Sequence, residues 1–354
     1  MADRSAATLL LCGYYGENNL GDDALLSVLL GDLPAGSRLW ITAHDPGALE
    51  QLCPQARRVD RRSLRAVLAA IGQVDVVVLG GGSLLQDSTS FRSLIYYLVV
   101  IAVARLRGRP VLLWGQGLGP LNRRLSRCLV RAVLPLCSGA SWRDATSFSR
   151  ARCWAPRLPM QVAPDPVWQV PEQPWVGGGA IVLSWRPTPL LDARGWCCLL
   201  DALAAVAERL DSPVCWLAFH QHQDAPLLAD LQEQKLMPES LVRRSSTVVP
   251  TDLTMVFAQV RTARLVIPMR LHALVLARLA GCPVAALSYD PKVAAAAEMA
   301  GIPCQPLARL PDAATLEQEW LVQADLAPSP ERITTIRRDA ARHGEQLRHG
   351  LSQL

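Results

Sequence analysis

Short apolar segments that end in glycine or polar residues recur along this chain of 354 residues. Four of them in the first half of the chain are residues 8–12, 74–79, 110–114 and 139–142. Apolar segments of this length are typical of strands buried in a parallel sheet, and helix-favouring segments separate them as in doubly wound α/β domains. The pattern predicts an α/β fold whose ligands bind at the carboxyl edge of the strands.

The length of the chain predicts two domains, because a single hydrophobic core rarely keeps growing to this size. Half of the residues are hydrophobic and 19% are charged, as in a globular protein with a large core. Residues 154–179 contain six prolines and end in three glycines, which indicates a linker. We therefore predict an N-terminal domain, a linker, a C-terminal domain and a charged terminal helix, at residues 1–170, 171–179, 180–327 and 328–354.

Composition and charge exclude several classes of protein. Ten cysteines without a Cys-x-x-Cys pair indicate neither zinc nor a disulfide framework, and predict a reducing cytoplasm. The net charge is +5, carried by arginine except for Lys235 and Lys292, which reflects either genomic composition or contact with anionic lipid or phosphate. No basic segment alternates with aromatic residues, so nucleic acid is not expected. Residues 94–106 are shorter than the roughly 20 that a membrane span needs, and we expect a buried helix there.

Residues 265–281 contain the strongest candidate site. Arg270 and His272 lie between an apolar strand-like segment and a helix-favouring segment that ends at Gly281. The N-terminus of a helix at the carboxyl end of a strand favours an anion. Residues two apart diverge by about 200° on a helix but share one face of an extended segment, so both side chains reach one ligand only if the helix begins at or after His272. The alternative is that Arg270 pairs with a carboxylate and His272 caps or packs locally.

Two loops of the first domain supply further candidates. Residues 13–23 are rich in glycine and asparagine but lack the dinucleotide spacing. Asp22 and Asp23 are either ordinary residues of a first helical turn or carboxylates that orient or deprotonate a hydroxyl. Residues 80–82 are three glycines at an expected strand-to-helix turn, which indicates close approach of a ligand or loop, or tight packing alone.

Cationic side chains at other strand ends are also candidates. Arg143 contacts an anion, or forms an ion pair with Asp144 or a neighbouring helix. Lys292 binds a ligand, or is a solvated residue at the start of a helix. His220, His222 and Asp224 either form a metal cluster or are hydrogen-bonding loop residues, and we favour the loop because no other ligand lies close in sequence.

Six motifs follow one another along the chain: Gly13-Tyr14-Tyr15-Gly16 with Asn19-Leu20-Gly21-Asp22-Asp23-Ala24, Gly80-Gly81-Gly82-Ser83-Leu84-Leu85-Gln86-Asp87, Gly115-Gln116-Gly117-Leu118-Gly119-Pro120, Arg143-Asp144 with Ser147, Met269-Arg270-Leu271-His272-Ala273, and Tyr289-Asp290-Pro291-Lys292-Val293. In this order they resemble the polysaccharide pyruvyltransferases, and specifically the branch linked to pyruvylated cell-wall polymers that anchor surface proteins. The resemblance covers about residues 9–301. Asn18 stands where the family more usually has glycine, and Pro268 where a small residue is expected.

The resemblance implies two Rossmann-like domains facing a central cleft, arranged as in GT-B glycosyltransferases. It also implies transfer of the enolpyruvyl unit of phosphoenolpyruvate to two sugar hydroxyls, which gives a pyruvate ketal and phosphate. Phosphoenolpyruvate is a co-substrate, and no further cofactor and no metal are expected.

The residue chemistry is consistent with this reaction. A carboxylate and a phosphate need at least two cations, which Arg270 with Arg143 or Lys292 would supply. We predict His272 as acid or base and Asp22 or Asp23 as the group that orients the sugar. The remaining predicted substrate-binding residues are Arg186, Asn19, Gly81, Gly82, Ser83 and Gln116.

Two other functions remain open. A GT-B glycosyltransferase that uses a nucleotide sugar would share the fold, but it usually needs a ribose-binding carboxylate, and residues 273–287 contain none. A non-catalytic polysaccharide-binding protein would need exposed aromatics, whereas aromatic residues make up only 5% of the chain. For the pyruvyltransferase, we expect a cytoplasmic protein with a free or lipid-linked saccharide acceptor, and with peripheral contact at the inner face of the membrane if the acceptor is lipid-linked.

Overall fold

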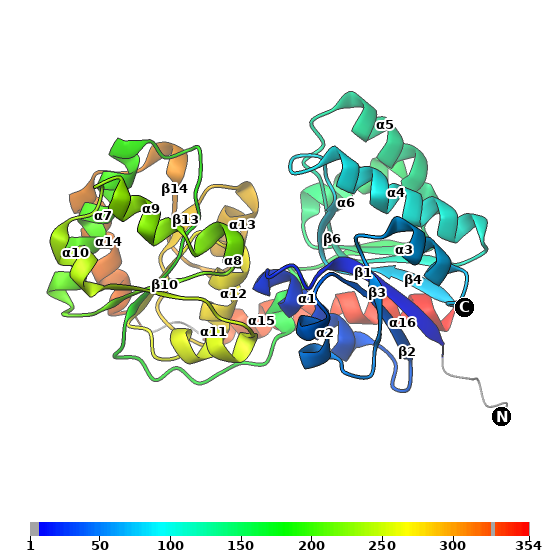
Figure 1. Cartoon of the computed structure of the whole chain (residues 1–354), viewed down its shortest axis with the longest axis horizontal. Helices are drawn as coiled ribbons and strands as arrows, with labels where there is room; N and C mark the ends of the chain where they lie inside the picture. Colours follow the sequence, from blue (N-terminus) through cyan, green and yellow to red (C-terminus); the bar gives the residue numbers. More distant parts are fainter. Residues whose placement is uncertain (1–6, 327–329, 354) are drawn as a thin grey trace. The chain divides into compact units, whose positions relative to one another are not determined.

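A computed structural model describes residues 7–326 and 330–353 of the chain. Contacts divide the chain into two compact units (Figure 1). The first unit comprises Met1–Glu17, Asp22–Gln169 and Arg337–Leu354, and the second comprises Asn18–Gly21 and Val170–Ile336. Each unit therefore includes a segment that is distant in sequence from the rest of it.

The first unit is built on an eight-stranded parallel sheet in the order β3-β2-β1-β4-β6-β7-β8, with β5 paired to β6. Its strands are β1 (Thr8–Tyr15), β2 (Arg38–Ala43), β3 (Arg57–Asp60), β4 (Val76–Leu79), β5 (Gly82–Leu85), β6 (Val111–Leu118), β7 (Gly139–Trp142) and β8 (Met160–Val162). The strand order reverses between β1 and β4. In doubly wound sheets this reversal opens a crevice at the carboxyl ends of the two strands.

Helices cover this sheet and bury its apolar side chains in one core. They are α1 (Leu20–Asp32), α2 (Pro46–Leu52), α3 (Leu64–Ile71), α4 (Phe91–Leu106), α5 (Arg124–Val133), α6 (Ala145–Trp154) and α16 (Arg342–Ser352), with short 3₁₀ turns η1 (Leu134–Leu136) and η2 (Pro166–Gln169). The apolar helix α4 buries one face, including Tyr97 and Ile101, which confirms a buried helix there. Helix α16 packs on β6, β7 and β8.

The second unit has a four-stranded parallel sheet in the order β11-β10-β9-β12, and β13 pairs with β14. The strands are β9 (Ile181–Ser184), β10 (Val214–Leu217), β11 (Ser245–Val248), β12 (Leu265–Pro268), β13 (Ala286–Ser288) and β14 (Cys304–Pro306). A parallel bridge between Val266 and Val284 joins the two sheets. The order reverses between β9 and β12, which is the switch point of this unit.

The helices of the second unit surround a separate core. They are α7 (Ala193–Arg209), α8 (Gln221–Asp224), α9 (Leu227–Glu233), α10 (Glu239–Arg244), α11 (Leu253–Val260), α12 (Leu271–Leu279), α13 (Pro291–Ala300) and α14 (Ala313–Ala324), with the 3₁₀ turn η3 (Leu307–Arg309). Helix α15 (Pro330–Ala340) begins in the second unit and ends in the first.

The proline-rich segment 154–179 is not irregular throughout, because its first part lies inside the first unit, within the predicted N-terminal domain 1–170. Residues of this segment form β8 and η2 inside the first unit. Pro159 and Pro164 lie just outside β8, and β8 is the last strand of the sheet. Proline is tolerated at such an edge because few ladder hydrogen bonds are lost.

The sequence predicted a strand-to-helix turn at the three glycines after β4, and this prediction is wrong. The chain continues into β5, which pairs with β6, and α4 begins only at Phe91. The terminal segment also differs from the single predicted helix, because it forms α15 and α16 with a break at Ala341. Residues 328, 329 and 354 of that prediction lie outside the described residues.

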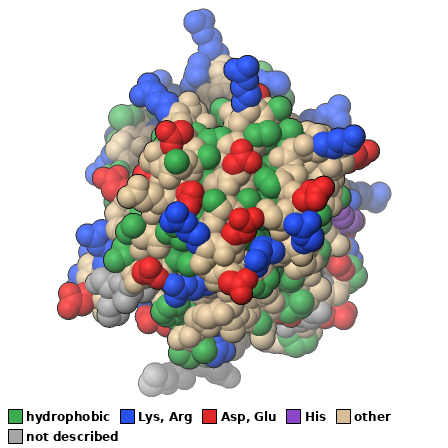
Figure 2. Space-filling model, turned by 90° about the vertical axis from the view of Figure 1, so that its left-hand side faces the viewer, with side chains coloured by type: hydrophobic (Ala, Val, Ile, Leu, Met, Phe, Trp, Pro, Cys, Tyr) green, Lys and Arg blue, Asp and Glu red, His purple; other side chains and the backbone are tan. Residues whose placement is uncertain are grey.

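Acidic and basic side chains alternate over the face shown in Figure 2, so the arginine excess does not form a single patch there. Within residues 7–326 and 330–353, no helix is both long and apolar enough to cross a membrane.

Candidate functional site

Arg270 lies at the switch point of the second unit. The apolar strand β12 ends at Pro268, and the Met269 N–H donates to the carbonyl of Ser184 at the end of β9 at 2.9 Å. Arg270 is the extended N-cap residue of α12. Ser184 Oγ is buried and has no hydrogen-bond partner among the described residues, an arrangement that a bound water or ligand would satisfy.

The guanidinium of Arg270 is held by a buried carboxylate. Its Nε lies 3.1 Å from Asp224 Oδ2, and its Nη2 pairs with Asp224 Oδ1 and with Gln223 Oε1 (3.1 Å). The Asp224 side chain is only 1% exposed and that of Arg270 is 14% exposed. This is the carboxylate pairing that the sequence left open as an alternative, and it fixes the orientation of the cation.

His272 does not share a face with Arg270. Helix α12 begins at Leu271, one residue too early for the geometry in which both side chains reach one ligand. The Arg270 side chain turns to Asp224, whereas the imidazole of His272 packs against the backbone of Gly21, where a Cβ would lie 2.1 Å from Nδ1. The two side chains therefore do not share one face of an extended segment.

His220, His222 and Asp224 follow β10 in a connecting loop, residues 219–224, that includes the short helix α8 and has hydrogen bonds of its own. Asp224 Oδ2 accepts from the His220 N–H at 2.9 Å, and His222 Nε2 lies 3.4 Å from Asn18 Nδ2. Burial, with the nearby Arg270 cation, lowers the pKa of His220. Within the described part of the chain, no group of three His, Cys, Asp or Glu residues could hold a metal.

Two further cations of the second unit lie at other strand ends. Arg186, just after β9, stacks on the ring of Tyr289 with 4.9 Å from Cζ to the ring centroid, and donates to its hydroxyl at 3.3 Å. Lys292 lies in the first turn of α13, where Asp290 caps the Lys292 N–H and pairs with its Nζ at 3.4 Å. Its side chain is partly exposed, as in the solvated alternative.

Asp22 and Asp23 lie in the first turn of α1, at the switch point of the first unit. Asp22 Oδ1 lies 3.4 Å from where a Cβ on Gly82 would stand, so the two residues are close. Burial raises the pKa of Asp23 to about 6, against a hydrogen bond from the Gly16 backbone that lowers it. An acid with this pKa exchanges its proton near neutral pH.

The consecutive glycines have a packing explanation. A Cβ on Gly80 would lie 2.1 Å from the Tyr15 hydroxyl, and one on Gly81 would lie 2.7 Å from the Leu25 side chain. Gly82 has a φ of +90°, a conformation that favours glycine. Side chains of this unit therefore account for the glycines at the first two positions.

Arg143 is part of a buried polar cluster. Its Nη1 pairs with Asp165 at 3.0 Å and its Nη2 donates to Ser83 Oγ at 2.8 Å. Asp144, the partner considered from sequence, instead caps α6 through Ser147. The Arg143 and Asp165 side chains are less than a tenth exposed. Gln116 is fully buried and donates to the Leu79 carbonyl at 3.3 Å.

The sequence analysis missed a cationic cluster after β3. Arg61 and Arg62 both pair with the buried Glu17, and Arg61 also stacks on Tyr14 at 4.3 Å from Cζ to the ring centroid. The signal was the arginine doublet, but β3 was not predicted and its end could not be located. Asp224 was missed as the partner of Arg270 because 46 residues separate the two.

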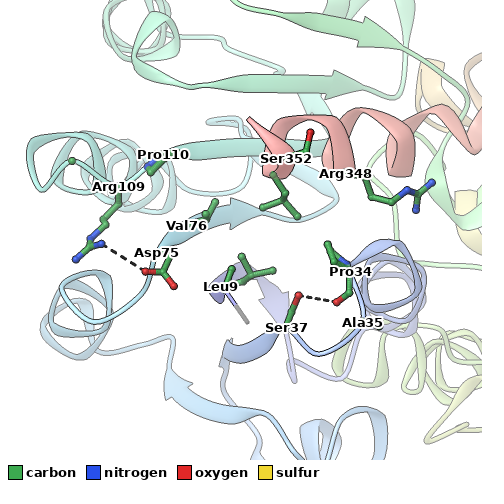
Figure 3. Close-up of a pocket in the computed structure, with 13 residues that line it drawn as sticks. Leu9, Pro34, Ala35, Ser37, Asp75, Val76, Arg109, Pro110, Arg348 and Ser352 are labelled. Carbon is green, nitrogen blue, oxygen red and sulfur yellow. Dashed lines mark hydrogen bonds and ion pairs between the residues drawn. The ribbon is translucent and has the colours of Figure 1, made fainter. Parts of the chain in front are cut away.

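A pocket of about 680 Å³ lies at the amino ends of strands of the first unit. Figure 3 shows Leu9, Asp75, Val76 and Pro110 at the amino ends of β1, β4 and β6, with Arg348 and Ser352 of α16 beside them. The pocket is at the edge opposite to Asp22 and Asp23. Because ligands of doubly wound sheets bind at the carboxyl ends of the strands, we take the carboxyl edges, and not this pocket, as the candidate site.

The two parallel sheets, their switch points and the cations at the strand ends define an α/β enzyme fold with two Rossmann-like units. Solved structures share it. A UDP-GlcNAc 2-epimerase of Methanocaldococcus jannaschii aligns over 97% of this chain and 99% of its own, with a TM-score of 0.61 and 11% identity. An Anabaena protein solved in complex with UDP and glucose aligns over 98% of this chain and 100% of its own, with a TM-score of 0.57 and 13% identity. At this identity the likeness shows the fold alone.

The sequence motifs identify the family. A family model for polysaccharide pyruvyl transferases matches residues 19–291, which include every predicted site residue except Lys292. The chain belongs to the polysaccharide pyruvyl transferase family. No curated protein matched the chain at a significant level.

Proposed function

We propose that this protein transfers the enolpyruvyl unit of phosphoenolpyruvate to two hydroxyls of a saccharide, forming a pyruvate ketal and releasing phosphate. The observation that carries the proposal is Arg270, a cation at the switch point and at the N-cap of α12, held in one orientation by the buried Asp224. Family membership supports the reaction class. A fixed guanidinium beside a helix N-terminus is suited to a carboxylate or phosphate.

The reaction forms two C–O bonds at C2 of the enolpyruvyl unit and breaks the C2–O bond to phosphate. The two sugar hydroxyls lose their protons; one proton is added at the methylene carbon, which becomes a methyl group, and the other leaves with the phosphate. Arg270, with Arg186 or Lys292 of the same unit, binds the two anionic groups of the donor. His272 transfers a proton, a role that typically contributes about 10²–10⁴-fold.

We assign the acceptor to the carboxyl edge of the first unit. Asp22 orients a sugar hydroxyl, and Asp23, whose pKa burial raises to about 6, binds beside it as an acid or base. Gly82 and Ser83, at the start of β5, are further acceptor-side residues of this unit, whereas Asn19 lies in the segment Asn18–Gly21 of the second unit. Because Gln116 is buried and Arg143 is paired with Asp165, these two residues hold the loops in place more than they contact the sugar.

The acceptor is a cell-wall or surface polysaccharide, free or lipid-linked, and the reaction takes place in the cytoplasm, where phosphoenolpyruvate is made. With a lipid-linked acceptor, the protein would contact the inner face of the membrane peripherally. Co-sedimentation with vesicles of anionic phospholipid tests this contact, and a protein that stays in the supernatant contradicts it.

A nucleotide-sugar glycosyltransferase is the second candidate, and the fold shared with a protein solved with UDP and glucose favours it. Such an enzyme needs a carboxylate for the ribose after the phosphate-binding helix start. Residues 273–287 contain none. We therefore favour pyruvyl transfer over glycosyl transfer.

Ligand-dependent thermal stability tests the donor. Phosphoenolpyruvate at a hundredfold over its dissociation constant will stabilise the protein by about 2.7 kcal/mol, and UDP-glucose will not. Arg270→Ala will abolish the shift, whereas Arg243→Ala, an exposed arginine of the same unit, will keep it.

Arg270→Ala also leaves the buried Asp224 without its cation, so the variant can fail to fold. The exposed Lys292→Ala variant provides a second measurement, with a reduced shift expected. Stabilisation by UDP-glucose alone would favour glycosyl transfer instead. A phosphoenolpyruvate shift that is unchanged in both variants would show that the donor binds elsewhere.

A further inference from the structure

The segment Asn18–Gly21 belongs by its contacts to the second unit, although the residues on both sides of it belong to the first. The Leu20 N–H donates to the Phe219 carbonyl, and the Gln221 N–H donates to the Asn18 carbonyl, each at 3.1 Å. Asn18 has a φ of +55°, a conformation that asparagine tolerates better than most residues, which explains how it replaces the more usual glycine. These bonds dock the segment on the loop after β10.

Gly21 is where this segment reaches His272. A Cβ on Gly21 would lie 2.1 Å from Nδ1 and 3.0 Å from Cγ of the imidazole. The φ of Gly21 is outside the left-handed region, so its backbone conformation does not require glycine. The contact with the imidazole requires it, because any side chain at this position would displace the ring.

The loop on which the segment docks also holds Arg270. Asp224, at the end of this loop, receives the Nε and Nη2 donors of Arg270 and the N–H of His220. One small element, made of Asn18–Gly21 and the loop 219–224, therefore contacts both residues of the candidate donor site.

We infer that this element is the positioning device of the donor site, in which Gly21 sets the position of the His272 imidazole and Asp224 sets the orientation of the Arg270 guanidinium. The inference rests on the proposed function for the roles of the two residues. A proton-transfer group and a donor-binding group are then positioned by separate contacts, so substitutions separate the two effects. Displacement of a catalytic group by about 1 Å can cost on the order of 10² in rate.

Gly21→Ala tests the first contact, and Gly31→Ala is its matched control. Gly31 lies in the same helix α1, and a Cβ there would meet nothing within 4 Å. We expect Gly21→Ala to lower kcat by roughly 10- to 100-fold with little change in KM for phosphoenolpyruvate. Gly31→Ala will keep both constants within about twofold, since that position is open and alanine favours helix.

Asp224→Asn tests the second contact, with the exposed Asp230→Asn as control. We expect Asp224→Asn to raise KM for phosphoenolpyruvate about tenfold and to change kcat less, because the guanidinium loses a charged partner but remains cationic. If Asp224 only stabilised its loop, the melting temperature would fall while KM stayed constant.

A readout independent of activity keeps the inference separate from the proposed function. The imidazole resonances of the six histidines, with that of His272 assigned through His272→Gln, will show a shift of the His272 signal in Gly21→Ala and none in Gly31→Ala. If the protein fails to use phosphoenolpyruvate but this signal moves, the proposed function fails and the contact stands. An unmoved signal together with wild-type kcat overturns the inference.

Gly21→Ala can also prevent folding. The double variant Gly21→Ala, His272→Ala removes the ring that the new methyl group would contact, so it will fold if the contact is the cause. In a folded background lacking His272, Gly21→Ala will have no further effect on kcat. An equal loss in both backgrounds contradicts positioning of His272 by Gly21.

Discussion

Asp23 is a residue of the candidate site whose burial lowers the stability of the folded protein. Its Oδ1 is buried and accepts no hydrogen bond from the described residues, and burial raises the pKa of the carboxyl from 3.8 to about 6. The native state therefore holds a proton more tightly than the unfolded state between these two values. The ionised form destabilises the fold at neutral pH, a cost that is common at functional positions.

Asp23→Asn will consequently stabilise the protein at pH 7.5, by about 2 kcal/mol, while it reduces transfer activity. The sign follows from the raised pKa: the wild-type contribution is present below pH 3.8 and is lost as the pH rises through about 6. Urea unfolding at pH 7.5 and at pH 4 measures the difference, which will almost vanish at the lower pH. Equal stability of the two proteins at both pH values would contradict the raised pKa.

At the scale of elements, helix α16 ties the end of the chain to the first sheet. His343 is buried in it, with Nε2 2.7 Å from the Pro164 carbonyl, to which the neutral ring donates, and its ring contacts Trp114. A Cβ on the neighbouring Gly344 would lie 2.0 Å from Asp32 Oδ1, so the helix approaches α1 closely. Packing of this kind makes α16 part of the first unit.

Burial lowers the pKa of His343 from 6.5 to about 4, so the unfolded state binds a proton first as the pH falls. The contribution of His343 to stability is complete above pH 6.5 and is lost progressively down to about pH 4. Between pH 7.5 and pH 5, the unfolding free energy of the wild type will fall by about 2 kcal/mol more than that of His343→Gln. The exposed His349→Gln in the same helix serves as control, and identical pH dependence in both variants would contradict the account.

The sequence predicted those elements whose signal is local. The apolar segments that became β1, β4, β6, β7 and β12 were identified because buried parallel strands need such residues. Strand β8 was missed because prolines flank it. Helix α12 begins at Leu271, one residue before the earliest start that would let Arg270 and His272 share one face. The partners of the site residues, Asp224 for Arg270 and Asp165 for Arg143, depend on the fold and leave no trace in local spacing.

At the scale of the whole molecule, the fold does not distinguish a phosphoenolpyruvate donor from a nucleotide-sugar donor. The fold is shared with a UDP-GlcNAc 2-epimerase and a protein bound to UDP and glucose, whereas the family is that of polysaccharide pyruvyl transferases. Both kinds of donor are anionic and suit a cation at a helix N-terminus. The central claim is therefore the identity of the group that is transferred.

Transfer of label from phosphoenolpyruvate carrying ¹⁴C in its enolpyruvyl unit tests this claim most directly. The purified protein would be incubated with a panel of oligosaccharides and, separately, with lipid-linked saccharides from a membrane extract, and phosphate release would be measured in parallel. We expect saccharide-dependent label that is stable to base and released by mild acid, as a ketal is, with one phosphate per transferred unit, and loss of both in Arg270→Ala. Label in the extract alone would identify a lipid-linked acceptor. Transfer of sugar from UDP-glucose, with phosphoenolpyruvate left intact in both incubations, would contradict the account.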